Sequence, residues 1–385
     1  MPGDALRWAE IDTTAMQHNA QVIKAGLRPE TRLMAMVKSN GYGHGATIAA
    51  RAALAGGATW LGVYTPDEAL ELRNAGIAEP ILVAGWSPPS THDALVSHGV
   101  DIAVFDVATL RDLATTARLR GRRARVHVKV DTGMGRLGVR PEAVDAMRQA
   151  LRDEGTSIEV AGVFTHFADA ESDLAFTKEQ HARFLYAADV LRSNAAETLL
   201  HTAGSAAILN VAAAHHDMVR LGIALYGYVP RGTAADVALR IAMSVFARVV
   251  QLKTVSADET VGYGRTWRAS TTRRVATVAI GYGQGVPRVL SNRGALVVGG
   301  NRCPIVGIVN MDQVTVDVSD SDGVTVGDAA MFFGESAGVR LGADEVADVA
   351  GTIPHEITCG VAASVPRLPR EAADRANGGR PTAVP

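Results

Sequence analysis

Eight short runs of apolar residues, rich in Val, Ile and Leu, alternate with stretches of helical composition in the first part of the chain. The runs lie at residues 33–38, 59–64, 81–86, 101–106, 125–131, 160–166, 198–203 and 218–223. Strands that alternate with helices in this way pair in parallel, and eight βα units within about 250 residues are what a closed (β/α)8 barrel requires. The sequence therefore predicts an α/β fold with a TIM-type (β/α)8 barrel.

A second type of pattern begins after Pro230. From about residue 240 onward β-branched residues alternate, as in 248–252, 274–280 and 314–318, and Gly, Asn and Asp turns separate the segments. We predict a barrel domain over residues 1–235, a mainly-β domain over 236–370 and a flexible polar tail over 371–385. The early run 8–12 precedes the first barrel strand and is a candidate to pair with the β domain.

The composition of the 385 residues excludes several classes of function. The 38 basic and 40 acidic residues give a net charge of -2 and are scattered along the chain, which argues against nucleic-acid binding. The apolar runs are too short to span a membrane. The two cysteines, Cys303 and Cys359, are too few for a disulfide framework, and no apolar leader precedes the first periodic segment. We therefore expect a soluble cytoplasmic protein.

Polar residues follow the predicted strand ends, which all face one mouth of a (β/α)8 barrel. A lysine at a strand end is most often a solvated surface residue, because its ammonium group resists burial. At the mouth, however, a desolvated Lys38 with a lowered pKa is a free amine that can form an imine with a carbonyl group. Lys38 ends the first strand, Lys129 and Arg136 lie on or just past the fifth, His166 ends the sixth, His201 and Ser205 flank the end of the seventh, and Arg220 ends the eighth.

Two further runs near the mouth point to an anion. Residues 205–207 and 222–224 follow the seventh and eighth strands, where barrels often bind a phosphate through backbone N–H groups. The glycine-rich segment 41–45 after Lys38 adds little by itself, since glycine turns are common. An imine-forming lysine together with a phosphate site is typical of enzymes that use pyridoxal 5'-phosphate (PLP). We therefore predict PLP as the cofactor.

Six segments stand out in order along the chain, residues 35–45, 129–138, 165–168, 218–227, 261–264 and 311–313. Together they resemble alanine racemases of the PLP-dependent type over nearly the whole chain. The resemblance implies that Lys38 binds PLP and is the base for the D-enantiomer. The base for the L-enantiomer is then Tyr263, which lies in the β domain and comes from a partner subunit. This arrangement implies a homodimer with shared sites. Racemisation needs bases on opposite faces, because the α-proton leaves from one face and returns on the other.

The same resemblance implies roles for the other residues at the mouth. Arg220 faces the pyridine nitrogen of PLP with support from His166, and its permanent charge leaves that nitrogen unprotonated. Arg136 and the backbone of Met311 bind the substrate carboxylate, and Lys129 matches a lysine that the family often carries as a carbamate. The D-alanine product feeds peptidoglycan or a specialised pathway. The residues that hold the phosphate of PLP are Tyr42, Ser205, Gly222 and Ile223, with His355 in addition.

Several positions depart from the family's pattern. His355 stands where the family usually has a tyrosine at the phosphate and the substrate entrance, and Ile308 stands where an arginine is common. Gly204 replaces an asparagine, and Gly-Gln-Gly at 283–285 replaces Ala-Asp-Gly. A histidine can still donate to phosphate, but it changes the shape and charge of the entrance, and the loss of an arginine weakens the steering of carboxylates. We expect an alanine racemase, with a serine or broader-specificity racemase as the alternative.

Three other classes of protein remain open at this stage. A PLP-dependent amino-acid decarboxylase shares the two-domain layout, but its glycine-triplet loop and cysteine motif are not visible, since Cys359 lies in Thr-Cys-Gly. A metal-dependent amidohydrolase needs a His-x-His pair at the first strand, where this chain has Lys38, so we predict no metal site. A non-catalytic PLP carrier lacks the second domain that bears Tyr263. Among the histidines, His201 has no assigned role, and His215 and His216 are expected to face solvent.

Overall fold

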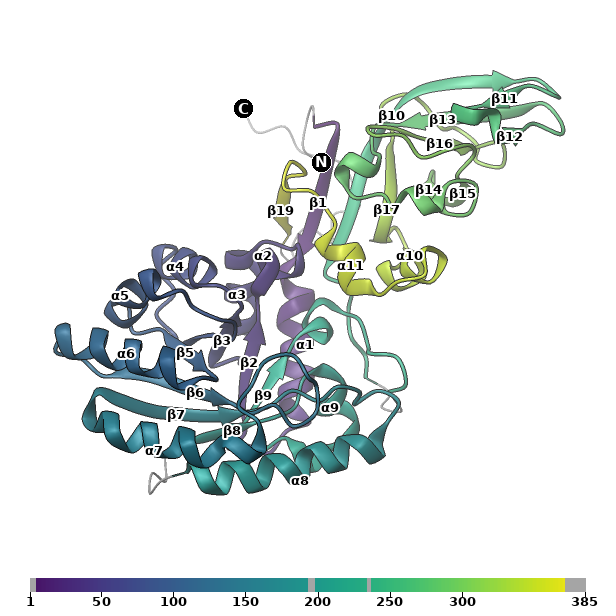
Figure 1. Cartoon of the computed structure of the whole chain (residues 1–385). Coiled ribbons are helices and arrows are strands. Elements are labelled where there is room, and N and C mark those ends of the chain that lie inside the picture. Colours follow the sequence, from purple (N-terminus) through teal and green to yellow (C-terminus); the bar gives the residue numbers. More distant parts are fainter. Residues whose placement is uncertain (1–4, 193–197, 234–236, 371–385) are drawn as a thin grey trace. The chain divides into compact units, whose positions relative to one another are not determined.

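The computed structural model describes residues 5–192, 198–233 and 237–370, which form two compact units (Figure 1). The β unit comprises residues 5–16, Tyr42–Gly45 and 240–370, and the barrel unit comprises Gln17–Gly41 and Ala46–Leu239. Among the described residues, no helix is both long and apolar enough to cross a membrane.

The barrel unit is built on eight parallel strands. They are β2 (Arg32–Met36), β3 (Trp60–Val63), β4 (Ile81–Val83), β5 (Asp101–Val104), β6 (Ala124–Lys129), β7 (Ile158–Phe164), β8 (Leu199–His201) and β9 (Met218–Leu221). Every pairing in this sheet is parallel, and the order β8-β7-β6-β5-β4-β3-β2-β9 places the first strand beside the last. Each of the eight predicted runs overlaps one of these strands, so the predicted (β/α)8 barrel is confirmed.

Backbone hydrogen bonds just outside the strands join β8 to β9 and close the barrel. Asp217 N donates to Leu200 O at 3.1 Å, and Arg220 N donates to Ala203 O at 2.9 Å. Both faces of a barrel sheet are covered, one by the interior and one by helices, which is why its strands read as unbroken apolar runs.

Helices alternate with these strands along the chain. One of them, α4, begins at a reciprocal capping box between Thr65 and Glu68. The Thr65 hydroxyl accepts from Glu68 N at 3.4 Å, and the Glu68 carboxylate accepts from Thr65 N at 3.1 Å. The helices are α1 (Thr13–Ala25), α3 (Ala46–Ala55), α4 (Pro66–Asn74), α5 (Pro89–Ser97), α6 (Val107–Leu119), α7 (Val144–Glu154), α8 (Leu174–Leu191) and α9 (Ser205–Asn210).

The β unit is mainly β, as predicted. Its large sheet contains β1 (Arg7–Asp12), β10 (Met243–Val255), β13 (Arg273–Val278), β14 (Ala295–Val298), β15 (Asn301–Pro304), β16 (Val314–Asp317), β17 (Ala329–Ser336), β18 (Val339–Leu341) and β19 (Arg367–Arg370). A separate two-stranded ribbon pairs β11 (Thr260–Val261) with β12 (Trp267–Arg268), and two helices, α10 (Ala343–Ala350) and α11 (Pro354–Cys359), precede β19.

Two segments from the first part of the chain belong to the β unit and not to the barrel. β1 pairs antiparallel with β10 and parallel with β19, so the candidate pairing of residues 8–12 is confirmed. The loop Tyr42–Gly45 is held by Arg367, whose Nε donates to Gly43 O at 2.8 Å. A Cβ on Gly43 would lie 2.1 Å from Thr358 O, so only glycine fits there. The division thus departs from the predicted barrel range 1–235, and the predicted tail, 371–385, lies outside the described residues.

Candidate active site

Lys38 begins α2 (Lys38–Tyr42), a short turn of left-handed geometry directly after β2. Ser39, Asn40 and Gly41 have φ of 53°, 53° and 61° and ψ of 51°, 48° and 46°. A hydrogen bond of 2.8 Å from Gly41 N to the carbonyl four residues earlier closes the turn. Left-handed helical geometry costs an L-residue about 1–2 kcal/mol, so consecutive residues hold it only where their surroundings compensate.

Two side chains supply that compensation. The Glu68 carboxylate, which also caps α4, accepts from Ser39 N at 2.5 Å. The amide oxygen of Asn40 accepts from Ala46 N at 2.9 Å. The first contact gives the Ser39 N–H an acceptor, and the second joins the Asn40 side chain to the first residue of α3. The turn is therefore held by both the α4 and the α3 segments.

Gly41 and Lys38 occupy opposite ends of this turn. A Cβ on Gly41 would lie 3.0 Å from the Ala49 methyl group, in addition to the positive φ that favours glycine there. Lys38 is partly buried, and its Nζ lies 5.9 Å from the centre of the Tyr64 ring. The glycine-rich segment therefore turns the chain sharply after β2 and leaves the Lys38 side chain at the end of the strand.

Cationic side chains converge at this mouth of the barrel unit, and the pKa values of two of its residues reflect it. Burial, followed by the charges of Arg136, Arg220 and Lys38, lowers the pKa of Lys129 to about 8. Burial, followed by the charges of Arg220 and Lys129, lowers the pKa of His166 to about 3, so its ring is neutral at neutral pH. A site with this charge favours anionic groups, such as a phosphate and a carboxylate.

The Phe164 ring lies next to three of the polar groups at the mouth. Lys129 Nζ lies 5.6 Å and Arg220 Cζ lies 5.5 Å from the ring centre. The His201 ring stacks on Phe164 at 4.8 Å with an interplanar angle of 4°. Strand register places Lys129, Phe164 and His201 side by side, because Lys129 pairs with Phe164 and Phe164 pairs with His201. An aromatic face attracts cations, so Phe164 offsets part of the repulsion between Lys129 and Arg220.

The Arg220 guanidinium is held through both terminal nitrogens. Its NH1 donates to the His201 carbonyl at 2.9 Å and to His201 Nδ1 at 3.0 Å. Its NH2 donates to the carbonyls of Thr165 and Thr202 at 2.7 and 2.9 Å and to His166 Nδ1 at 3.1 Å. Within the described ranges no residue accepts from Nε–H. Burial lowers the pKa of Arg220 to about 10, so the group stays charged at neutral pH and can offer this donor to a ligand.

The predicted phosphate ligands of the barrel unit lie together just after the ends of β8 and β9. Ser205 opens α9, and its Oγ accepts from Gly222 N at 3.0 Å and from Ala224 N at 3.4 Å. Ile223 follows directly as the first residue of η4 (Ile223–Tyr226). Ser205, Gly222 and Ile223 therefore lie at one place, where the hydroxyl hydrogen of Ser205 and the Ile223 N–H can face an anion.

Gly204 departs from the asparagine of the family pattern, and the structure supplies a reason. A Cβ at this position would lie 3.1 Å from Cε1 of His166. Glycine therefore leaves room for the His166 ring, which accepts from Arg220.

Tyr42 and His355, two further predicted phosphate ligands, lie together in the β unit. Their ring centres are 5.8 Å apart at an interplanar angle of 44°, and His355 belongs to α11. Burial, followed by the nearby Cys359, raises the pKa of the Tyr42 hydroxyl. The hydroxyl therefore stays protonated and can donate to an anion.

Tyr263 and Met311 are exposed on the surface of the β unit. Tyr263 lies between β11 and β12, at the start of η5 (Tyr263–Arg265), and is 75% exposed, while Met311 is 57% exposed. Gly262 and Gly264 flank the tyrosine with φ of 76° and 67°, which glycine adopts without a steric penalty. The turn thus presents the tyrosine outward from its own unit.

Residues 283–285, which differ from the Ala-Asp-Gly of the family pattern, pack against the backbone of Met311. Gly283 N donates to Met311 O at 2.8 Å. Gln284 accepts from Gly281 N and donates to Asp312 Oδ1, both at 2.9 Å. The glutamine therefore ties this turn to the residue that follows Met311, and the departure from the family pattern keeps Met311 supported.

No role was expected for His201, and Asp101 and His127 were not singled out from the sequence, yet all three are buried and His127 contacts both of the others. A signal was available, because each is a polar residue next to apolar residues in a buried strand. Buried polar groups of this kind need partners, and that requirement points to a network.

His215 and His216 do not face solvent, so that prediction was wrong. His215 is buried, and its Nε2–H donates to the Ile208 carbonyl at 2.8 Å. His216 is partly buried, and its Nε2 lies 2.8 Å from Nε2 of His181 on α8. The segment between α9 and β9 packs back onto neighbouring helices, which a pattern of local residues does not reveal.

Two family models match the chain, "Alanine racemase, N-terminal domain" over residues 11–230 and "Alanine racemase, C-terminal domain" over residues 242–369. The alanine racemase of Symbiobacterium thermophilum is 41% identical over 364 residues, which cover 94% of this chain and 96% of the relative. The alanine racemase of Cutibacterium acnes is 39% identical over 365 residues, with coverage of 93% and 96%.

Solved structures of the same kind cover both units. The alanine racemase from D-cycloserine-producing Streptomyces lavendulae has a TM-score of 0.90 at 36% identity, covering 97% of this chain and 99% of that one. The Bacillus anthracis alanine racemase with bound L-Ala-P has a TM-score of 0.89 at 33% identity, covering 97% of each chain. The Bartonella henselae alanine racemase with covalently bound pyridoxal phosphate has a TM-score of 0.85 at 28% identity, with coverage of 95% and 99%. These matches confirm the resemblance carried by the six segments.

Proposed function

Because the chain belongs to the alanine racemase family, we propose that it interconverts L- and D-alanine with PLP bound at the mouth of the barrel unit. The observation that carries the proposal is the setting of Arg220, a charged group whose Nε–H has no acceptor among the described residues. A donor that cannot accept fits an unprotonated pyridine nitrogen. The cations Lys38, Lys129 and Arg136 nearby fit a phosphate and a carboxylate.

PLP, when bound, withdraws electrons from the substrate's α-carbon and so makes its proton acidic. Arg220 donates to the ring nitrogen and, because it stays charged, keeps that nitrogen unprotonated. Arg220 thereby limits the charge that the ring takes up, which favours return of the proton to the α-carbon over side reactions.

Lys38 would hold the cofactor's aldehyde carbon through its amine, with release of water, until the amine of the substrate replaces it. The freed Lys38 amine would then move the α-proton on one face of the substrate. Tyr263 of the partner subunit moves the proton on the opposite face. The 75% exposure of Tyr263 on its own chain supports a role in a neighbouring subunit, since a buried tyrosine is not available to a second copy. The active enzyme is therefore a homodimer with shared sites.

Lys129 and Arg136 form the carboxylate side of the site. With a pKa of about 8, Lys129 is partly an unprotonated amine near neutral pH, and such an amine combines with carbon dioxide to give a carbamate. A carbamate replaces one cation among several by an anion, which relieves their repulsion and orients Arg136. Arg136 then binds the substrate carboxylate together with the backbone of Met311.

The phosphate group is held by hydroxyl, imidazole and backbone donors. Two observations support this assignment: the Tyr42 hydroxyl stays protonated, and Gly222 N donates to Ser205 Oγ, which brings these two residues together. The complete set is Tyr42, Ser205, Gly222, Ile223 and His355.

The reaction takes place in the cytoplasm and supplies D-alanine for peptidoglycan or for a specialised pathway. Neither Cys303 nor Cys359 forms a disulfide among the described residues, which suits a reducing compartment.

A broader specificity is the second candidate, and His355 and Ile308 favour it. Both differ from the residues that usually border the substrate entrance, and neither carries the permanent charge of an arginine. Turnover of L-serine beside L-alanine distinguishes the two readings.

The proposed function is tested by incubating the purified full chain with PLP and L-alanine in deuterated water. We expect the optical activity of alanine to fall to zero while deuterium appears at the α-carbon. A protein saturated with PLP that forms no D-alanine would refute the proposal.

A further inference from the structure

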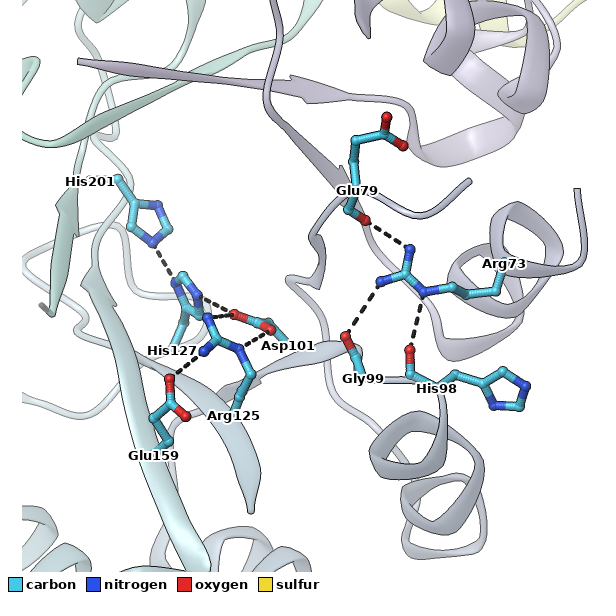
Figure 2. A network of polar contacts seen from close by, with 9 residues as sticks. All are labelled: Arg73, Glu79, His98, Gly99, Asp101, Arg125, His127, Glu159 and His201. Carbon is cyan, nitrogen blue, oxygen red and sulfur yellow. Dashed lines mark hydrogen bonds and ion pairs between the residues drawn. The ribbon is translucent and has the colours of Figure 1, made fainter. Parts of the chain in front are cut away.

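A row of buried polar side chains crosses the barrel unit from Asp101 to Arg220, and Figure 2 shows its first three members. Asp101 Oδ2 lies 3.1 Å from His127 Nε2, and His127 Nδ1 lies 2.8 Å from His201 Nε2. His201 Nδ1 lies 3.0 Å from Arg220 NH1. Asp101 is 1% exposed, the two histidines are 0% exposed and Arg220 is 5% exposed. Asp101, His127 and His201 have no role in the proposed function.

Arg220 at one end of the row and the Asp101 carboxylate at the other set the same direction for every hydrogen bond between them. A guanidinium can only donate, so His201 Nδ1 accepts and the His201 proton lies on Nε2. His201 then donates to His127 Nδ1, which places the His127 proton on Nε2, where it is donated to Asp101. Burial, followed by its neighbours His127 and Arg220, lowers the pKa of His201 well below its ordinary value, in agreement with a neutral ring. Two neutral imidazoles thus join a cation to a carboxylate.

Asp101 is held at the far end as an ionised acceptor. Burial alone would raise the pKa of its carboxyl, but the hydrogen bond from His127 and the contact with Arg125 keep it below its ordinary value. Arg125 Nε donates to Asp101 Oδ1 at 2.9 Å, and the other side of Arg125 pairs with Glu159, as drawn in Figure 2. A buried network whose members are all satisfied is rigid, because any rotation leaves a polar group unpaired.

The backbone around His127 makes room for the row. The pairing of β6 with β7 shifts its register between Val126 and His127. A Cβ on Gly162 would lie 2.3 Å from His127 Nδ1, the atom that accepts from His201. An irregular register and a glycine at the same point indicate that the fold specifies the contact between the two histidines.

We infer that Asp101 and His127 are positioning residues for the proposed racemisation, because they keep His201 Nδ1 unprotonated and able to fix the Arg220 guanidinium. If the row ran in the opposite direction, His201 would present an N–H to an N–H of Arg220, and the guanidinium would rotate away. The effect on the reaction rests on the proposed function, whereas the direction of the row does not.

The Asp101→Asn variant reverses the row with almost no change in volume. Arg125 donates to both carboxylate oxygens, from Nε to Oδ1 at 2.9 Å and from NH2 to Oδ2 at the longer distance of 3.3 Å. The asparagine therefore keeps its oxygen at Oδ1, where the shorter contact is, and places its NH2 group at the Oδ2 position. This NH2 group donates to His127 Nε2, which moves the His127 proton to Nδ1 and, in turn, the His201 proton to Nδ1, against Arg220.

The tautomers of His127 and His201 are read from 15N chemical shifts in histidine-labelled protein, with and without PLP. On the same samples, kcat and KM for L-alanine and the absorbance spectrum of bound PLP are measured. We expect Asp101→Asn to move both ring protons, shift the cofactor absorbance and lower kcat about tenfold or more with little change in KM. Glu159→Gln is the matched control, because it removes a charge beside Arg125 without touching the row, and it keeps wild-type values. Reversed tautomers with a wild-type spectrum and kcat would overturn the positioning role.

A pair of variants at His127 decides the matter if Asp101→Asn fails to fold. His127→Gln retains one donor and one acceptor, so it preserves the direction of the row, whereas His127→Leu fills the space and breaks the row. We expect His127→Gln to keep the wild-type kcat and spectrum and His127→Leu to lose them. Equal behaviour of the two variants overturns the inference. A wild-type protein that neither binds PLP nor racemises alanine refutes the proposed function alone, since the 15N shifts still report the direction of the row.

Discussion

Arg220 contacts His201 twice, because its NH1 donates to the ring nitrogen Nδ1 at 3.0 Å and to the carbonyl at 2.9 Å. The two contacts come from one residue, so the position of the guanidinium depends on both the backbone and the tautomer of His201. Outer partners of this kind orient a group that binds a cofactor and influence its chemistry as strongly as direct contacts do.

Lys38→Ala is expected to abolish racemisation and the visible absorbance of bound PLP, because the amine that binds the aldehyde is lost. Absorbance after gel filtration and an assay for D-alanine measure both effects. Lys178→Ala, an exposed lysine on α8, is the control and keeps wild-type values. Activity in the Lys38 variant would contradict the assigned role.

Tyr263→Phe is expected to keep the cofactor absorbance but to slow the conversion of L-alanine by on the order of 10²–10⁴, the contribution of one acid–base group. Initial rates from the L and the D side, with a solvent exchange assay, resolve the two directions. Tyr186→Phe, at another exposed tyrosine, is the control. Unchanged rates from the L side would remove Tyr263 from the mechanism.

A mixture of Lys38→Ala and Tyr263→Phe proteins is expected to regain activity after exchange of subunits. If sites are shared in a homodimer, one of the two sites in each mixed dimer has both an intact lysine and an intact tyrosine. Activity is measured before and after joint denaturation and refolding, and each variant treated alone is the control. Mixed dimers that form but stay inactive would exclude shared sites.

His355→Tyr is expected to narrow the substrate range toward alanine, since tyrosine is the usual residue at the entrance. The ratio of kcat/KM for L-serine to that for L-alanine measures the change. Ile308→Arg is the second variant, because it introduces the arginine that is common at this position, and it is expected to lower the same ratio. An exclusive alanine preference in the wild-type protein would refute the broader reading.

His166 is expected to make the stability of the cofactor-free protein depend on pH. Its pKa is about 3 in the folded chain against an ordinary value of 6.5, so between these limits the unfolded chain binds a proton that the folded chain does not. The free energy of unfolding therefore rises with pH across this window and is lost as pH falls through it. Urea unfolding at several pH values should show a smaller slope for His166→Asn than for the wild type, while the exposed His98→Asn should leave the slope unchanged.

The barrel and the place of its mouth could be predicted because local sequence carries that information. Strands covered on both faces are apolar throughout, and residues such as Lys38 and Arg220 follow their ends. The ends of parallel strands meet whatever the details of packing, so these side chains could be placed in one region. Tyr263 lacked such a local signal, and only the resemblance to a family pointed to it.

The amino-acid sequence by itself determined the eight strands, the mainly-β second unit and the cationic character of the mouth, because these follow from patterns of neighbouring residues. Only the tertiary structure showed that Asp101, His127 and His201 are joined by hydrogen bonds. His127 lies 26 residues from Asp101 and 74 residues from His201. Their meeting depends on strand order, on the irregular register at His127 and on the space beside Gly162. Hydrogen bonds between side chains require distances that only the closed barrel sets.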